Sequence, residues 1–145
     1  MEKKAFALLI KDHEKVKGII EELLASSASA KRRRQELLHT LKEELQVHEK
    51  LEEDVVYPVL EHKKATHDLA LEAYEEHHVV DVLLEELDGM EFKDEAWKAK
   101  LTVLQENLLH HIAEEEQELF PKAQKNLSQQ QLDQIERKIA DAKGA

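Results

Sequence analysis

Histidines and carboxylates are the side chains of this sequence that could carry chemistry. Nine histidines occur among its 145 residues, together with 32 aspartates and glutamates, and there is no cysteine. The lack of cysteine excludes disulfides, thiolate metal sites and cysteine nucleophiles. Any metal ion bound by this chain must therefore be held by nitrogen and oxygen ligands.

Two of the histidines that are followed by a glutamate four residues later are His48 and His111. His48 and Glu52 are four residues apart, and so are His111 and Glu115. On an α-helix this spacing puts the two side chains on one face, roughly 6 Å apart along the axis. Each pair could therefore direct an imidazole and a carboxylate towards the same metal ions.

Apolar periodicity selects the histidines that face the interior. In four segments, leucine, isoleucine and valine recur at steps of three and four residues, which is the period of one helix face. Each of these stripes carries one histidine near its middle, and two of the stripes carry a glutamate one turn later. The residues selected in this way are His13, His48, Glu52, His77, His111 and Glu115.

These six residues would lie in one layer of an antiparallel bundle, because mid-helix positions meet at the same height. Four imidazoles and two carboxylates buried together are costly without a partner, and metal ions supply one. Six ligands are too many for one tetrahedral zinc ion but suit two octahedral ions with shared carboxylates. We predict a dinuclear site in which Glu52 and Glu115 bridge the ions and each ion takes two histidines.

Taken one at a time, the same residues have ordinary structural explanations. A lone histidine on an apolar face is usually a hydrogen-bonded core residue, and His-xxx-Glu on a helix is a common surface pair. Glu49, Asp81 and Tyr57 stay open: each could reach the metals, but a solvated acid is expected for the first two and an interfacial aromatic for the third. The remaining histidines are expected at the surface or, for the last two, just behind the ligands: His39, His62, His67, His78 and His110.

Four long helices and one short helix are needed to position these residues. The long helices are predicted over residues 3–25, from the basic run 31–34 to about residue 61, over 66–88 and over 94–125. A capping box at Ser128–Gln131 predicts the short fifth helix. Short connections favour antiparallel neighbours, so the fold class is all-α: an antiparallel up-down four-helix bundle over residues 1–125, with residues 126–145 as a C-terminal helix packed on the same domain.

The two halves of the sequence repeat each other at a period near 63 residues. The segments Asp12–Leu23 and Glu76–Leu87 both have a histidine second and end in Glu-Glu-Leu. The segments His48–Pro58 and His111–Pro121 both read His-xxx-Glu-xxxx-aromatic-Pro. The period is too long, with too few copies, for a solenoid. We therefore predict a pseudo-two-fold bundle built from two helix pairs.

The charge balance restricts the partners. The formal net charge of −11 repels phosphate backbones and anionic membrane surfaces, so neither nucleic acid nor a membrane is an expected partner. The basic run Lys31–Arg34 is expected to be a solvated helix start. The apolar run Ala5–Ile10 is too short for a signal peptide, and no later segment approaches membrane-spanning length. A cytoplasmic protein is expected.

Four motifs carry a family resemblance: Asp12-His13, His48-Glu49-Lys-Leu-Glu52 with Tyr57-Pro58, Glu76-His77, and His111-xxx-Glu115 with Phe120-Pro121. With these motifs the chain resembles the hemerythrin-like, HHE cation-binding domain family. The resemblance implies a four-helix bundle with an oxo- or hydroxo-bridged centre of two iron ions, and manganese or zinc could occupy the same ligands. It assigns the six residues that periodicity selects as the ligands, and Glu49 matches a position that contributes a ligand in some relatives.

Two departures from the oxygen-carrying hemerythrins bear on function. Those proteins have His-xxx-His on the third helix and His-xxxx-Asp on the fourth, whereas this chain has Asp81 after His77 and Glu115 after His111. Fewer histidines leave more coordination positions open, which favours reaction with dioxygen, peroxide or nitric oxide in stress response over oxygen carriage. The alternatives are an iron- or oxygen-sensing or iron-handling module without turnover, and a metal-free helical scaffold.

Overall fold

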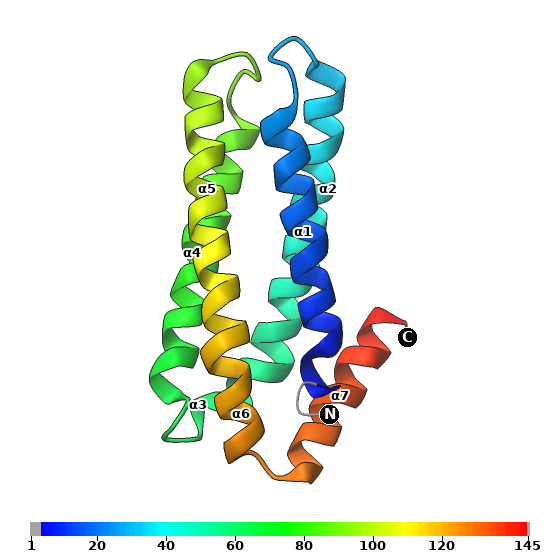
Figure 1. Ribbon diagram of the computed structural model, residues 1–145, viewed down its shortest axis with the longest axis vertical. Helices are drawn as coiled ribbons and strands as arrows, with labels where there is room; N and C mark the ends of the chain where they lie inside the picture. Colours follow the sequence, from blue (N-terminus) through cyan, green and yellow to red (C-terminus); the bar gives the residue numbers. More distant parts are fainter. Residues whose placement is uncertain (1–3, 145) are drawn as a thin grey trace.

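The computed structural model describes residues 4–144, which fold almost entirely into helices (Figure 1). No strand occurs within this range, and the predictions for residues 1–3 and 145 lie outside it. In chain order the elements are η1 (Lys4–Phe6), α1 (Ala7–Ala25), α2 (Lys31–Leu51), η2 (Glu52–Val56), α3 (Tyr57–Glu61), α4 (His67–Asp88), α5 (Glu95–Glu114), η3 (Glu115–Leu119), α6 (Phe120–Asn126) and α7 (Gln129–Lys143).

Four antiparallel rods form the bundle. α1 runs away from the end that holds the N-terminus, α2 with η2 and α3 returns, α4 runs away again, and α5 with η3 and α6 returns (Figure 1). α1 packs against α2 and α5, while α4 packs against α5, α3 and α2. α7 lies against η1 and η2. The predicted four-helix bundle with a short C-terminal helix is confirmed. Every helix in the described range is too short or too polar to span a membrane.

The capping box predicted for the fifth helix is present. The Ser128 hydroxyl accepts a hydrogen bond from the Gln131 backbone N–H at 3.1 Å, and the Gln131 side chain accepts one from the Ser128 N–H at 3.0 Å. Two N–H groups at the start of α7 are thereby satisfied. The apolar face of α7 is buried in the adjoining core through Leu132, Ile135 and Ile139.

Two apolar clusters make up the core, one on each side of a polar layer. The first surrounds Phe6, Phe120 and Leu60 at the end near α7, and the second surrounds Leu41, Trp97 and Leu101 at the other end. On α1 the change from one cluster to the other falls between Leu9 and Val16. The mid-helix histidines lie in this interval, so both cores exclude water from the layer between them.

Two π-helical turns, η2 and η3, interrupt the second and fourth rods at matching positions. In each turn the N–H of the following aromatic residue bonds to the carbonyl of the glutamate five residues earlier. A proline comes next, at Pro58 and Pro121. Proline lacks an N–H, and its ring clashes with the carbonyl four residues earlier in an α-helix. A wider turn accommodates it, which the prediction of plain α-helices did not include.

The basic run Lys31–Arg34 is only partly solvated. Its first three residues are exposed, but Arg34 is buried. The Arg34 guanidinium donates to the Ser26 hydroxyl and carbonyl, both at 2.9 Å, and to the Phe92 carbonyl. It also lies over the Trp97 ring, 4.5 Å from the centroid. Arg34 therefore ties together the two loops at the far end of the bundle.

Candidate metal centre

The structure brings all six sequence-predicted site residues into the polar layer. His13 comes from α1, His48 from α2, His77 from α4 and His111 from α5, while each glutamate opens one of the two π-helical turns. No member of the set is more than 5% exposed: His13, His48, Glu52, His77, His111 and Glu115. The helices place these side chains together because all six lie on the inward face of their rods.

The side chains form two groups that share both carboxylates. Glu52 and Glu115 join His13 and His48 in one group and His77 and His111 in the other, with the ligand atoms of each group within 4.8 Å of one another. The Nε2 atoms of His13 and His77 lie 3.0 Å from Glu115 and Glu52, respectively. The Nε2 atoms of His48 and His111 lie 3.3 and 3.4 Å from the glutamate one turn later. Four imidazole nitrogens thus surround two central carboxylates.

A carboxylate behind each imidazole orients its ring. The Nδ1–H of each histidine donates to an acid on a neighbouring helix, so each Nε2 atom faces the centre. The four pairs are His13 with Glu116 at 2.6 Å, His48 with Asp12 at 2.9 Å, His77 with Glu53 at 2.7 Å, and His111 with Glu76 at 2.6 Å. This arrangement prepares neutral imidazoles to act as metal ligands.

Sequence reasoning missed the role of these four outer acids, although the internal repeat contains a signal for them. Asp12 and Glu76 each directly precede a site histidine, and Glu53 and Glu116 each come directly after a site glutamate. Each acid therefore recurs at the equivalent position of the other half. Asp12 and Glu76 support histidines of their own half, whereas Glu53 and Glu116 support histidines of the opposite half. The pseudo-two-fold symmetry thus extends beyond the inner six residues.

Tyr57, for which an interfacial position was expected and a contact with the site left open, lies inside the site. Its phenol donates to Glu52 at 3.0 Å, contacts Glu115, and lies 3.2 Å from the Nε2 atom of His77. In an α-helix a residue five positions after Glu52 points about 140° away from it. The π turn brings these two residues onto one face, because its hydrogen bonds join residues five apart. The equivalent residue of the other half is Phe120, which has no hydroxyl.

Opposite charges hold the metal-free site together. Burial alone would lower the pKa of His48, but the charge of Glu52 and the hydrogen bond with Asp12 outweigh it and raise this pKa to about 10. The pKa of His111 is raised in the same way, chiefly by Glu115. Burial would raise the pKa of Glu52, but the surrounding histidines hold it well below its usual value. Without metal, imidazolium ions therefore neutralise the central carboxylates.

Three buried polar atoms of the layer nevertheless lack hydrogen-bond partners: His48 Nε2, His111 Nε2 and Glu52 Oε2. An unpaired buried polar atom costs about 1–3 kcal/mol. The atoms belong to imidazole and carboxylate groups, which bind iron, manganese and zinc. The residues present therefore fit bound metal ions, and such ions would remove this cost.

Two more contacts lie at the edges of the site. Glu49, which was expected to be solvated, is instead 7% exposed and lines a cavity of about 10 Å³ beside the four histidines. Burial and then the carboxyl of Asp81 raise the pKa of Glu49 to about 10. On the opposite side, the Lys143 ammonium of α7 donates to Asp12 at 2.8 Å. The C-terminal helix thereby supports the acid that orients His48.

The five remaining histidines are exposed, as predicted. Among them, His110 is 65% exposed and lies 3.8 Å from Glu76 and 3.3 Å from Glu114. The exposed set is His39, His62, His67, His78 and His110. These five imidazoles therefore face solvent and do not belong to the buried layer.

Comparison with known families agrees with this geometry. Residues 4–123 match the family described as the Hemerythrin HHE cation binding domain, a range that includes every residue of the layer and stops before α7. A comparison with curated proteins finds no significant match. With a family match over most of its length and a buried histidine–glutamate cluster at the position of the motifs, the chain belongs to the hemerythrin HHE cation-binding domain family.

Proposed function

We propose that this protein binds two iron ions and reacts with dioxygen, peroxide or nitric oxide as part of a stress response. The observation that carries the proposal is the sharing of Glu52 and Glu115 between two groups of histidines. A carboxylate has two oxygens and can serve two ions, so the shared glutamates suit a bridged pair. In this proposal His13 and His48 hold one ion, and His77 and His111 hold the other.

The chain's own residues prepare the site in three ways. The outer acids hold each imidazole with its Nε2 atom directed inward. The two apolar clusters exclude bulk water from the layer. Tyr57 holds a proton at its phenol oxygen, because burial and the charges of Glu115 and Glu52 raise its pKa well above the usual value. A di-iron centre, when bound, supplies the redox chemistry that these side chains lack.

Oxygen carriage is not part of the proposal. Asp81 stands where the oxygen carriers have a histidine on the third helix, and its side chain is exposed on α4, outside the six inner residues. The family's small ligands would therefore meet a site with four histidines. This composition supports a reactive or sensing centre.

Metal content and absorption of the wild type and of His48→Ala test the proposal. The wild type should carry two iron ions per chain, and the reduced protein should change its visible spectrum on exposure to dioxygen, peroxide or nitric oxide. His48→Ala should lose metal while keeping its helix content. A wild type that takes up no metal, or one whose reduced spectrum stays silent with all three ligands, would contradict the proposal.

A second candidate is an iron-sensing or iron-handling module without turnover. The ligand residues of this site come from four different rods, so metal binding is coupled to folding. This coupling favours the second candidate. This candidate predicts a melting temperature that falls strongly on chelation, together with a reduced spectrum that does not respond to oxygen species. A melting temperature indifferent to chelation would count against it.

A further inference from the structure

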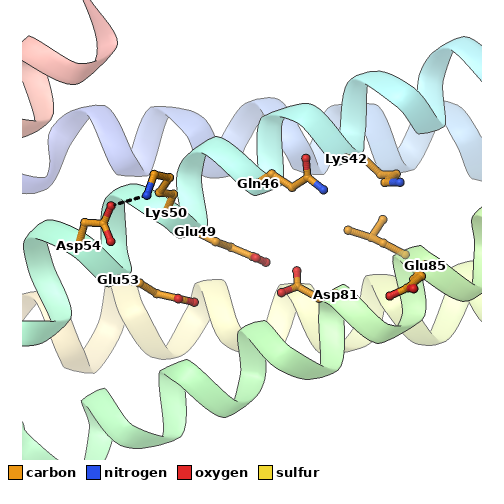
Figure 2. A pocket seen from close by; sticks show the side chains of 9 residues that line it. Lys42, Gln46, Glu49, Lys50, Glu53, Asp54, Asp81 and Glu85 are labelled. Atoms are coloured by element: carbon orange, nitrogen blue, oxygen red, sulfur yellow. Dashed lines mark hydrogen bonds and ion pairs between the residues drawn. The ribbon is translucent and has the colours of Figure 1, made fainter.

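A groove of about 610 Å³ runs along the outside of the bundle between α2 and α4 (Figure 2). Five acidic residues line it: Glu49, Glu53 and Asp54 from the second rod, and Asp81 and Glu85 from α4. In Figure 2 the Glu49 and Asp81 carboxyl groups extend towards each other across the groove. The groove is therefore an acidic channel at the surface of the metal-binding layer.

The two lysines of the groove do not neutralise it. Lys50 pairs with Asp54 at 2.8 Å, and Lys42 pairs with Asp88, which lies outside the groove. Even without Glu49, whose buried carboxyl group has a raised pKa, Glu53, Asp81 and Glu85 give the groove a net negative field. A hollow lined by one sign of charge focuses that field and attracts the opposite ion.

Glu49 connects this groove with the interior. The same side chain lines both the groove and the small cavity that touches all four site histidines. His48, which is 5% exposed, lines the same small cavity, and its Nε2 atom lacks a hydrogen-bond partner. Glu53, also in the groove, accepts the Nδ1–H of His77. The groove and the layer of site histidines are therefore joined by the side chains of Glu49 and Glu53.

The internal repeat supplies a built-in comparison, because the α1–α5 interface is the pseudo-two-fold equivalent of the α2–α4 interface. At that interface Ile112 occupies the position of Glu49, and Lys17 occupies the position of Asp81. The hollow there measures only about 60 Å³. Ile112 lines the inner cavity as Glu49 does, but it offers no carboxylate. The open acidic groove is thus confined to one of the two equivalent faces.

We propose that the α2–α4 groove is the entrance by which a hydrated divalent metal ion reaches the site, with Asp81 at its mouth and Glu49 at its inner end. This inference rests on the proposed function, since it requires that the site binds metal. A neutral molecule such as dioxygen gains nothing from a row of acidic side chains, and an anion is repelled by them. A divalent cation is attracted, and each carboxylate can replace part of its water shell.

The test follows the rate of Co²⁺ uptake by the metal-free protein in a stopped-flow instrument, read from the visible absorption of the bound ion. Replacing Glu49→Gln and Asp81→Asn together removes two carboxyl groups with little change of shape. Uptake at low salt should slow by about tenfold or more, a typical size for lost electrostatic steering, and the difference should shrink at high salt. The final number of ions per chain should equal that of the wild type.

A matched control removes two carboxyl groups elsewhere. Glu21→Gln with Glu106→Gln takes two exposed acids from α1 and α5, away from the groove, and should leave the uptake rate within about twofold of the wild type. Asp81→Asn alone provides a variant at an exposed position, where folding is not at risk. A second double variant, Glu49→Ile with Asp81→Lys, copies the equivalent face and should slow uptake further.

Each outcome decides a separate point. Equal uptake rates in the groove variants and the control would overturn the entrance. A groove variant that binds fewer ions at equilibrium would also overturn it, because Glu49 would then be a ligand and not a point on the route. A wild type that takes up no Co²⁺ at all would instead contradict the proposed function.

Discussion

At the scale of single residues, Tyr57 makes the two halves of the site unequal. Its phenol contacts both shared carboxylates and His77. On the other side Phe120 presents a ring to His13, with centroids 6.2 Å apart and planes 2° from parallel. One group of ligands therefore has a neighbouring hydroxyl that the other lacks, and two ions bound there would have different surroundings.

Tyr57→Phe should remove this difference with almost no change in volume. Hydrogen bonds to charged groups contribute about 1.5–3 kcal/mol, so the metal-free variant should lose stability of that order in urea unfolding. The metal-loaded variant should keep two ions per chain but show an altered absorption spectrum. Tyr74→Phe is the control, since Tyr74 packs edge-on against Tyr57 outside the ligand groups. Identical spectra for wild type and Tyr57→Phe would contradict the expectation.

The outer acids should set metal affinity without touching the ions. Glu116 accepts the Nδ1–H of His13, so Glu116→Gln weakens the contact that orients the ring. Loss of such a partner typically lowers metal affinity by about 10- to 100-fold. Competition titration with a chelator measures this change. Glu118→Gln, two residues further on at an exposed pair with Lys122, should leave the affinity unchanged. Equal affinities for both variants would show that the outer acid has no orienting role.

At the scale of elements, the π-helical turns set the direction of the residues after each shared glutamate. Both η2 and η3 begin at such a glutamate and end just before an aromatic–proline pair. Each turn takes up one extra residue. Leu60 and Ala123, which come after the turns, therefore lie on the same inward face as the shared glutamates and are buried in the core. The turns thus let one rod serve both the metal layer and the apolar cluster below it.

Deleting Asp54 from η2 should convert the π turn into an α turn. Tyr57 would then follow Glu52 by four residues, about 40° round an α-helix, and would stay on the same face as Glu52. We expect a metal spectrum like that of the wild type, together with a lower melting temperature, because the ring of Pro58 would clash with the carbonyl four residues earlier in the α-helix. Circular dichroism should show helix content retained. Deleting Lys64, in the loop before α4, is the control and should lower the melting temperature much less.

At the scale of the whole molecule, four rods enclose a polar layer that is charged when metal is absent. Six titratable side chains lie between two apolar clusters, and the imidazolium–carboxylate contacts among them take the place of metal–ligand bonds. Such buried contacts depend on every partner keeping its charge. The stability of the metal-free protein should therefore depend on pH more strongly than that of the loaded protein.

The metal-free protein should lose stability as the pH rises from about 6.5 towards 10. The folded-state pKa of His48, about 10, exceeds its ordinary value of 6.5, and those of His77 and His111 are also raised. Their contribution is fully present below pH 6.5 and is lost as the pH rises through the folded-state values. The raised pKa of Glu49 acts in the same direction. Glu52, with a lowered pKa, acts oppositely and only at acid pH.

Urea unfolding at about pH 6, 7.5 and 9 measures this trend in chelated protein. Because bound ligands are already deprotonated, the metal-loaded protein should show a shallower slope. The gap between the two forms should widen with rising pH. A metal-free protein equally stable at all three values would contradict the assignment of imidazolium ions to the layer.

The sequence by itself determined the helices, the repeat and the inward direction of the site histidines. These features result from a local rule, since residues three or four apart share a helix face wherever the helix lies. His13, His48, His77 and His111 could be selected because the apolar neighbours on their own segments mark the buried side. The match of the two halves then placed the four segments at one height.

Only the tertiary structure decided which side chains meet across helices. Glu116 and His13 are 103 residues apart, and no periodicity within one segment relates them. Tyr57 enters the site through a π turn, which departs from the 3.6-residue period on which the sequence prediction depends. The burial of Glu49 and the opening of a groove on one face depend on the residues of the opposing helix, which include Asp81 there and Lys17 on the equivalent face. Such contacts depend on packing between rods, so they emerge only when the bundle is assembled.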